Sequence, residues 1–308
     1  MKTLSKEMQE KIAYLMTLKS RDIDMCMINA LNDDMPREML LDCLTLYINK
    51  DGGYAHGLHI DNYNTNTSVY QIYEAFRLLR MLGFDKSLDS ELYDMVINKP
   101  MNYLFNRCAP INNRWNANTK SNNDFPHSML FTYNEENTRL LGLHPTAALA
   151  GYILVLAREN KAYYKKALAM AKVLIKELYN KDSLTRYELT SYNSLLNSLK
   201  ECKLFNEEWD KIEEKLIYHA EELLKDGYDP NGVRPLEVAF YIHSKRLDEL
   251  KNLELDHIID SIAPHGLWNH NEGWGTNKYA EEDSAMLKWV GAESVNNYFM
   301  LKKYGRLD

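Results

Sequence analysis

Apolar side chains recur at helical spacing along most of the chain. The clearest stretch follows Thr67, a residue type that caps helices, and repeats apolar positions at offsets of 3, 4, 7 and 10: Val69, Ile72, Tyr73, Phe76 and Leu79. Counted in this way, the pattern predicts eleven helices, at residues 5–19, 36–49, 67–82, 89–106, 145–158, 161–178, 187–200, 206–224, 234–243, 246–262 and 283–303.

Short turns separate most neighbouring helices, so the simplest arrangement is a succession of antiparallel helix pairs. Five and a half pairs nearly complete a ring of six hairpins. Three helix-poor segments interrupt the series, at residues 50–66, 107–144 and 263–282. Because long ordered loops in compact domains commonly carry function, these segments supply most of the candidate site residues.

The composition fits a helical globular protein. The 308 residues include only 13 glycines and 8 prolines, and 45% of them are hydrophobic, which is enough for a large core. The net charge of −7, without a cluster of basic residues, argues against a nucleic-acid partner. The four scattered cysteines lack CxxC spacing, so the sequence predicts neither a zinc site nor a disulfide framework.

Two stretches bear on localisation. The N-terminal stretch MKTLSKEMQEKIAYLM mixes charged with apolar residues and lacks the apolar run of a signal peptide, which predicts a cytoplasmic protein. An uncharged run from Leu140 to Ala157 has spanning length, but its first half contains a His-Pro-Thr sequence. We interpret this run as a loop that leads into a buried helix, so no membrane span is expected.

The first helix-poor segment contains three candidate catalytic residues. His56, His59 and Asp61 lie close together in sequence, and such side chains can transfer protons. Tyr54 beside them is a candidate substrate contact. A metal site is not predicted, because the loop lacks the i, i+4 scaffold of helical metal-binding histidines. Simple hydrogen bonding within the loop is the structural alternative.

The third helix-poor segment holds the densest cluster of aromatic and acidic residues. Trp268, His270 and Trp274 are candidate substrate contacts, and Glu282 and Asp283 are candidate catalytic acids. Indole faces stack on the C–H faces of sugars, while carboxylates bind hydroxyls or transfer protons. The same aromatic rings could stabilise a carbocation. Alternatively, Trp268 and Trp274 anchor the last hairpin against the first.

Further candidate substrate contacts lie outside these two clusters. Trp289 and Glu293 stand four residues apart on the last predicted helix, where they extend the aromatic stripe with a polar group. Trp115 and His127 belong to the asparagine-rich segment 107–144, which is longer than a connection needs. A surface insertion is the structural alternative for that segment.

The stretch DGGYAHG at residues 51–57, together with the helix that follows it, resembles the repeat of terpenoid cyclases and protein prenyltransferase β subunits. Two other passages, LHPTAALAG at 143–151 and the ending from Trp268 to YGRL at 304–307, resemble uncharacterised bacterial proteins of the same superfamily. The resemblance implies an all-α fold, an (α/α) toroid in which inner helices surround a central cavity. A single domain over residues 1–308 would form it.

The aspartate-rich motifs of squalene-type cyclases and of ionising terpene synthases are absent from the sequence, as is an Asp, Cys and His set for zinc. The expected function is therefore the binding of a small molecule, isoprenoid-like or a glycan, in a central aromatic and acidic cavity, with acid–base catalysis and no cofactor. A carbohydrate hydrolase or lyase of the six-hairpin type is one alternative. A non-catalytic binding or scaffold protein is another, and the sequence leaves open whether the chain is an enzyme.

One geometric prediction follows from the alternation of helices. The loops at 51–66 and 263–282 each precede an inner helix, so both should lie at the same end of the barrel. That arrangement would bring His56 and Asp61 towards Trp268 and Glu282.

Overall fold

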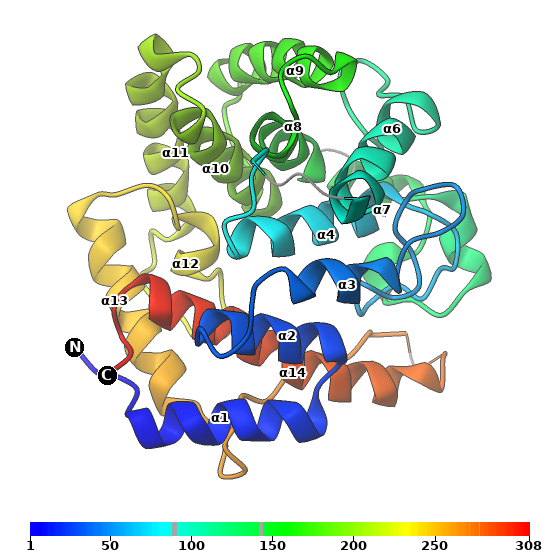
Figure 1. Ribbon diagram of the computed structural model, residues 1–308. Coiled ribbons are helices and arrows are strands. Elements are labelled where there is room, and N and C mark those ends of the chain that lie inside the picture. The colour runs from blue at the N-terminus through cyan, green and yellow to red at the C-terminus, as the bar shows by residue number, and fades with distance from the viewer. Residues whose placement is uncertain (88–90, 142–143, 271, 277) are drawn as a thin grey trace.

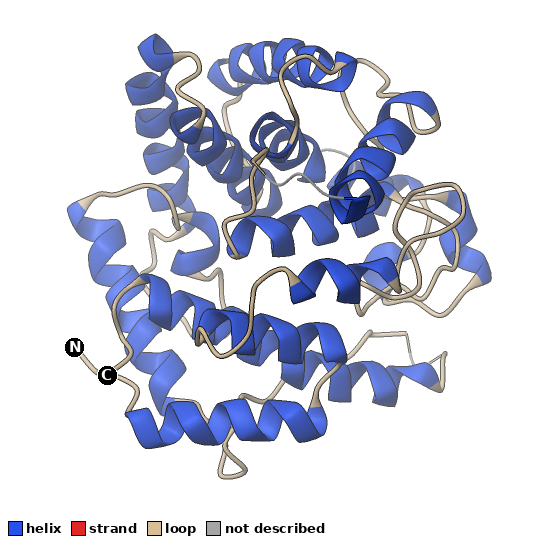
Figure 2. Ribbon diagram, viewed as in Figure 1, coloured by secondary structure: helices blue, strands red, loops and turns tan. Residues whose placement is uncertain are grey.

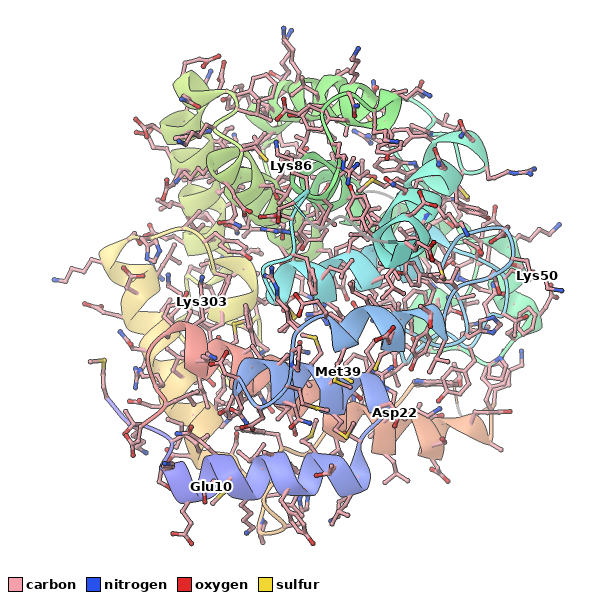
Figure 3. The ribbon with its side chains drawn as sticks, viewed as in Figure 1. Glu10, Asp22, Met39, Lys50, Lys86 and Lys303 are labelled. Atoms are coloured by element: carbon pink, nitrogen blue, oxygen red, sulfur yellow. The ribbon has the colours of Figure 1, made fainter. Side chains whose placement is uncertain are left out.

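The computed structural model describes residues 1–87, 91–141, 144–270, 272–276 and 278–308. The fold is all-helical, as predicted, with about 60% of the chain in helices and no β-strand among the described residues (Figures 1 and 2). Charged side chains such as Glu10 and Lys50 lie on the outside of the helical body (Figure 3). No described helix has the length and apolar character that a membrane crossing requires.

The α-helices, in chain order, are α1 (Lys6–Lys19), α2 (Asp22–Leu31), α3 (Met39–Thr45), α4 (Val69–Met81), α5 (Glu91–Tyr93), α6 (Lys99–Asn106), α7 (Glu135–Leu141), α8 (His144–Leu156), α9 (Ala162–Tyr179), α10 (Arg186–Glu201), α11 (Trp209–Leu223), α12 (Pro235–Val238), α13 (Lys245–Asp260) and α14 (Glu281–Lys303). Shorter helical turns are η1 (Asp94–Asn98), η2 (Lys120–Asp124), η3 (Met129–Phe131) and η4 (Asn206–Glu208).

Two helices were not predicted by the apolar pattern, α2 and α7. The missed α2 is only ten residues long, and polar residues crowd both of its ends. It nevertheless buries a complete apolar face that includes Ile23, Met27 and Leu31. Asp22 and Asp24 in its first turn interact favourably with the helix dipole.

Three predicted helices are shorter or interrupted, and the one expected at 36–49 is reduced to α3. The helix expected at 89–106 contains a π-helical turn, η1, immediately before α6. Pro100 explains this interruption, because it has no backbone N–H to donate and it stands in the first turn of α6. The helix expected at 234–243 is reduced to α12. Beyond α12, the free carbonyls of Ala239 and Ile242 accept hydrogen bonds from the buried Lys251 ammonium group.

The helix α8 is the most deeply buried element of the fold. Every residue from 145 to 157 is buried, and α8 packs against α4, α9 and α10. Gly151 permits the close approach of α10, because a Cβ atom there would lie 2.8 Å from Ser198 Oγ and 3.1 Å from the Cα atom of Leu195. The part of the uncharged run from 145 to 157 is therefore a buried helix, as predicted, while residues 142 and 143 of the expected loop lie outside the described residues.

The two ends of the chain lie side by side (Figure 1). Leu4 and Leu307 form a parallel bridge, in which the Leu4 N–H donates to the Arg306 carbonyl at 2.7 Å. The last helix, α14, packs against α2, and Gly291 on α14 faces Ser20 at the start of that contact. The C-terminal helix thus completes the core of the N-terminal helices.

Candidate functional site

A cavity of about 580 Å³ occupies the interior. Side chains of α4, α8, α10, α12 and α14 line it, together with Arg21 just before α2 and with residues 58–61, 128, 130, 270 and 272–274 of the segments between the long helices. None of its lining residues comes from α1, α3, α6, α9, α11 or α13. In chain order, the helices that contribute residues to the wall thus alternate with helices that do not, and Figure 1 shows where each helix lies in the fold.

The wall of the central cavity is rich in charge. Five arginines line it: Arg21, Arg77, Arg80, Arg186 and Arg234. Five carboxylates line it as well: Asp61, Glu74, Glu237, Glu272 and Glu293. Two buried polar atoms of the wall, Ser128 Oγ and Asn193 Oδ1, have no hydrogen-bond partner among the described residues. Such atoms are uncommon in native cores unless a ligand or water satisfies them.

Four of the five arginines are held in ion pairs. On α4, Arg77 binds Glu74 through two hydrogen bonds of 2.9 and 2.8 Å. Burial alone would raise the pKa of Glu74, but the charge and hydrogen bonds of Arg77 lower it to about 2. Arg21 binds Asp24 in the same bidentate way, and Arg80 binds Glu201.

Arg234 connects three helices at the wall of the central cavity. It precedes α12 and donates to Glu254 of α13 at 2.8 Å and to Glu293 of α14 at 2.9 Å. Its remaining nitrogen donates to Asn297 at 3.0 Å. Glu293, a predicted substrate contact, therefore lines the central cavity but is already paired with an arginine.

Asp61 is fixed by two tryptophans. Its Oδ1 atom accepts the indole N–H of Trp274 at 3.0 Å and that of Trp289 at 2.6 Å. The ring of His270 stacks on Trp289, with centroids 4.8 Å apart. The prediction that the loops at 51–66 and 263–282 meet is confirmed by the contact between Asp61 and Trp274. No described residue bonds Oδ2, which leaves this oxygen for a ligand or water.

His59 completes the aromatic part of the wall. Its ring contacts those of Tyr70, Phe131 and Trp289, at centroid distances of 4.9, 5.2 and 5.7 Å. Burial lowers the pKa of His59, so the ring is neutral at neutral pH. Gln71 of α4 holds the loop in place, because its side-chain oxygen accepts the His59 backbone N–H at 2.7 Å.

Glu237 on α12 has a different environment from Asp61. Burial raises the pKa of its carboxyl group, against the opposing charges of Arg186 and Arg234. Among the described residues, no donor forms a hydrogen bond with this carboxylate. A carboxyl group with a raised pKa is suited to act as a general acid.

Three aromatic residues predicted as substrate contacts lie in the core instead. Tyr54, Trp115 and Trp268 are almost completely buried, and none lines the central cavity. Each polar group is satisfied by a backbone carbonyl, of Val96, Leu104 and Ile258 respectively. The position of Trp268 fits the alternative interpretation, a packing anchor, because its ring is buried and its indole N–H donates to a backbone carbonyl.

His56 and His127, both singled out from the sequence, serve loop geometry. The exposed His56 has a positive φ of 61° and hydrogen-bonds to Asn49 at 2.7 Å. His127 is buried, and its two ring nitrogens contact Phe125 O at 2.6 Å and Thr132 Oγ1 at 3.1 Å. Neither histidine lines the central cavity.

The two acidic residues predicted at the start of α14 also lie outside the wall. Glu282 accepts the backbone N–H of Trp274 at 2.6 Å and so fixes the loop that carries this tryptophan. Asp283 is exposed in the first turn of α14, where a negative charge favours the helix dipole. The structure therefore brings together six of the predicted residues at the central cavity: His59, Asp61, His270, Trp274, Trp289 and Glu293.

Sequence reasoning missed Arg186 and Glu237 in the wall. Glu237 lay in a stretch read as an ordinary helix, and Arg186 immediately follows the capping residue Thr185 of α10. One signal was available on α4, where Glu74 and Arg77 stand three residues apart on a helix that is otherwise apolar on most sides. Charged pairs on such a helix are typical of a polar interior.

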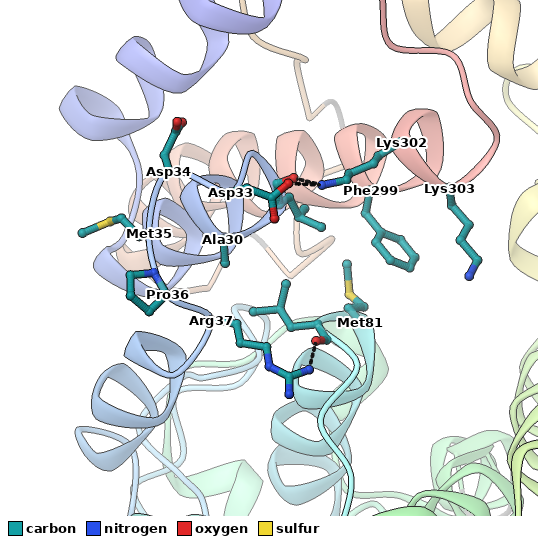
Figure 4. Close-up of a pocket in the computed structure, with 12 residues that line it drawn as sticks. Ala30, Asp33, Asp34, Met35, Pro36, Arg37, Met81, Phe299, Lys302 and Lys303 are labelled. Carbon is teal, nitrogen blue, oxygen red and sulfur yellow. Dashed lines mark hydrogen bonds and ion pairs between the residues drawn. The ribbon is translucent and has the colours of Figure 1, made fainter. Parts of the chain in front are cut away.

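A second depression, here called the outer hollow, has a volume of about 740 Å³ (Figure 4). It lies between the end of α2, the segment 33–37 and the end of α14. Lys302 binds the Leu31 carbonyl and Asp33, while Arg37 donates to the carbonyls of Leu82 and Gly83. Met81 and Phe299 line both the outer hollow and the central cavity.

Metal-binding geometry and similarity to known proteins complete the description. Within the described ranges, no three His, Cys, Asp or Glu side chains gather in a way that could hold a metal ion. Neither a family model, nor a curated protein, nor a solved structure matches this chain.

Proposed function

We propose that the chain is an (α/α) toroid of the kind found in terpenoid cyclases and protein prenyltransferases, and that its central cavity is an active site. The alternation of helices supports the toroid, because α4, α8, α10, α12 and α14 line the central cavity while the long helices between them do not.

The charged wall favours a glycan over an isoprenoid as the ligand. Ten of the lining side chains are ionisable, and a hydrocarbon chain would displace water from them without offering a hydrogen bond in return. A sugar offers hydroxyl groups to the charged atoms and C–H faces to the aromatic rings. The unpartnered Ser128 Oγ and Asn193 Oδ1 also favour a polar occupant.

Acid–base cleavage of a glycosidic bond is the reaction that this wall supports best. Glu237 would donate its proton to the leaving oxygen as the glycosidic C–O bond breaks. Asp61 would take a proton from the attacking water, and solvent would restore both groups. The observation that carries this proposal is the contrast between two carboxyl groups of one cavity: Asp61 accepts two indole N–H bonds, whereas the half-buried Glu237 has a raised pKa and no hydrogen-bond donor among the described residues.

The test is turnover of a panel of nitrophenyl glycosides and natural oligosaccharides by the purified chain. Asp61→Asn and Glu237→Gln should each lower kcat by about 10²–10⁴-fold while the substrate still binds. Matched controls are Asp283→Asn and Glu214→Gln, both exposed and outside the wall. The wild-type rate should fall as pH rises through the raised pKa of Glu237. Full activity in both cavity variants would refute the assignment.

An isoprenoid ligand is the second candidate, and one observation favours it. The inner wall carries a cluster of tyrosines, in which Tyr70 and Tyr73 meet edge-on and Tyr73 stacks on Tyr152 at 6.2 Å. Such faces can stabilise a carbocation. Mass spectrometry of organic extracts of the purified protein distinguishes the two classes. Retention of a sugar with no turnover would leave the non-catalytic binding protein as the function.

A further inference from the structure

Arg186 differs from the other arginines of the central cavity. Arg21, Arg77, Arg80 and Arg234 each bind a carboxylate, whereas no described carboxylate oxygen lies within 4.0 Å of the Arg186 guanidinium group. Its contacts are with Tyr187: it lies 4.7 Å above the ring and donates to the hydroxyl at 2.8 Å. This guanidinium group keeps donors for a ligand.

Two carboxylates face Arg186 without touching it. Glu237 and Glu272 both act on its charge through space, and both line the same cavity. Glu272 lies in the loop before α14, and none of the described residues forms an ion pair or a side-chain hydrogen bond with it. Arg186, Glu237 and Glu272 therefore lie on three different elements, and the guanidinium group is more than 4.0 Å, the limit for an ion pair, from either carboxylate.

The surrounding contacts hold Arg186 and Glu272 in place. Arg186 begins α10, whose start is fixed by a capping box between Thr185 and Glu188. Glu272 is followed by Gly273, where a Cβ atom would lie 2.7 Å from Glu282 Oε1. The glycine thus allows the hydrogen bond of Glu282 with Trp274, which anchors the loop two residues after Glu272.

The charge arrangement selects among polar ligands. A hydroxyl group both accepts from a guanidinium group and donates to a carboxylate, so it satisfies both sides. A ligand carboxylate would pair with Arg186 but meet the repulsion of Glu237 and Glu272. A ligand ammonium would pair with the glutamates but meet the repulsion of Arg186. Neighbouring hydroxyls of a neutral ligand satisfy all of these groups.

We propose that Arg186 and Glu272 form a specificity site that binds two neighbouring hydroxyls of a neutral sugar at the rim of the central cavity. This inference rests on the proposed function and names its substrate class as neutral rather than acidic or amino sugars. Glu237, next to the pair, then acts on the bond that joins this sugar to its neighbour. Arg186 and Glu272 determine which sugar is held there.

Isothermal titration and saturation-transfer NMR with sugars of three charge classes test the inference. The neutral sugars are methyl glucoside and methyl galactoside, the acidic sugar is glucuronate and the amino sugar is glucosamine. The wild type should bind a neutral glycoside more tightly than either charged sugar. Arg186→Met and Glu272→Gln should each weaken neutral binding by about tenfold or more. Glu272→Gln should shift the preference towards glucuronate, and Arg186→Met towards glucosamine. Arg107→Met and Glu214→Gln, exposed and outside the wall, are the controls.

Both cavity variants change exposed side chains, so their unfolding midpoints should match the wild type. Wild-type preference for a charged sugar, neutral binding unaffected by either variant, or no sugar binding at all would each overturn the inference. If the wild type cleaves a glycoside and Arg186→Met and Glu272→Gln cleave it equally well, the specificity site is overturned and the proposed reaction stands. Neutral sugar that binds through these residues and is never cleaved, even by the wild type, overturns the proposed reaction and leaves the specificity site standing.

Discussion

The central cavity and the outer hollow meet at Met81 and Phe299, yet they are built differently. The outer hollow is the larger, at about 740 Å³ against about 580 Å³. Its ion pair between Lys302 and Asp33 is exposed, with 41% and 89% of the side-chain surfaces accessible. The pair between Arg77 and Glu74 in the central cavity keeps only 26% and 11% accessible. Volume alone therefore does not identify the site.

The two regions differ in the free energy that is lost when their charged groups are removed from water. An exposed pair is solvated on most sides and gains little from its partner. A largely buried charge depends on its partner, because water no longer compensates it. Several such pairs around one cavity reduce the free energy of folding that remains, because each requires desolvation of two charged groups. In this chain these pairs lie at the central cavity. The outer hollow has no comparable set of buried charges among its lining residues.

The largest expected effect follows from breaking the buried pair. Glu74→Gln leaves the Arg77 guanidinium group without its carboxylate, so we expect the free energy of unfolding to fall by about 3–5 kcal/mol. Urea unfolding followed by circular dichroism measures it. Glu214→Gln on the exposed face of α11 is the control and should change stability little. A loss below about 1 kcal/mol for Glu74→Gln would show that water solvates this pair as well.

The pH dependence of stability sharpens the same contrast. The pKa of Glu74 is lowered from 4.5 to about 2 in the folded chain. Its contribution is therefore fully present above about pH 4.5 and is lost as the pH falls towards 2. Urea midpoints measured from pH 6 to pH 2 should fall more steeply for the wild type than for Glu74→Gln. Parallel curves for the two proteins would contradict the low pKa.

The helices of this fold could be predicted where one face is apolar over several turns. The face of α4 was predicted because Ile72, Phe76 and Leu79 repeat at helical spacing. The ten residues of α2 were too few to show a repeat against their polar flanks, and the helix is stabilised by packing against α1, α3 and the distant α14. Local periodicity does not report such long-range contacts.

The candidate site was predicted only where a loop's position followed from the alternation of helices. The loops at 51–66 and 263–282 were expected to meet, and a hydrogen bond joins Trp274 of one to Asp61 of the other. Trp115 and Trp268 were misplaced, because the sequence does not distinguish an indole that meets a ligand from one that fills the core. Glu237 escaped notice because the charges that act on its pKa, such as those of Arg186 and Glu254, belong to residues distant in sequence.

A smaller effect is expected at the aromatic wall. Trp289→Phe keeps a ring against His59 and His270 but removes the 2.6 Å N–H bond to Asp61. We expect a loss of about 1–2 kcal/mol in the free energy of unfolding, since a hydrogen bond to a charged group disappears and Trp274 still donates. Differential scanning calorimetry of this variant and of Trp209→Phe, whose indole lies outside the wall, makes the comparison. Equal losses would mean that Asp61 does not depend on its second donor.

The smallest effect is expected in the outer hollow. Lys302→Met and Asp33→Asn, alone and together, form a double-mutant cycle for the exposed pair of Figure 4. We expect a coupling energy below about 0.5 kcal/mol, because solvent screens both groups and the Lys302 ammonium group also binds the Leu31 carbonyl. The same cycle with Arg77→Met and Glu74→Gln should give a coupling several times larger. If both cycles gave the same value, the two regions would not differ in how they hold charge, and the choice of the central cavity as the site would lose its main physical argument.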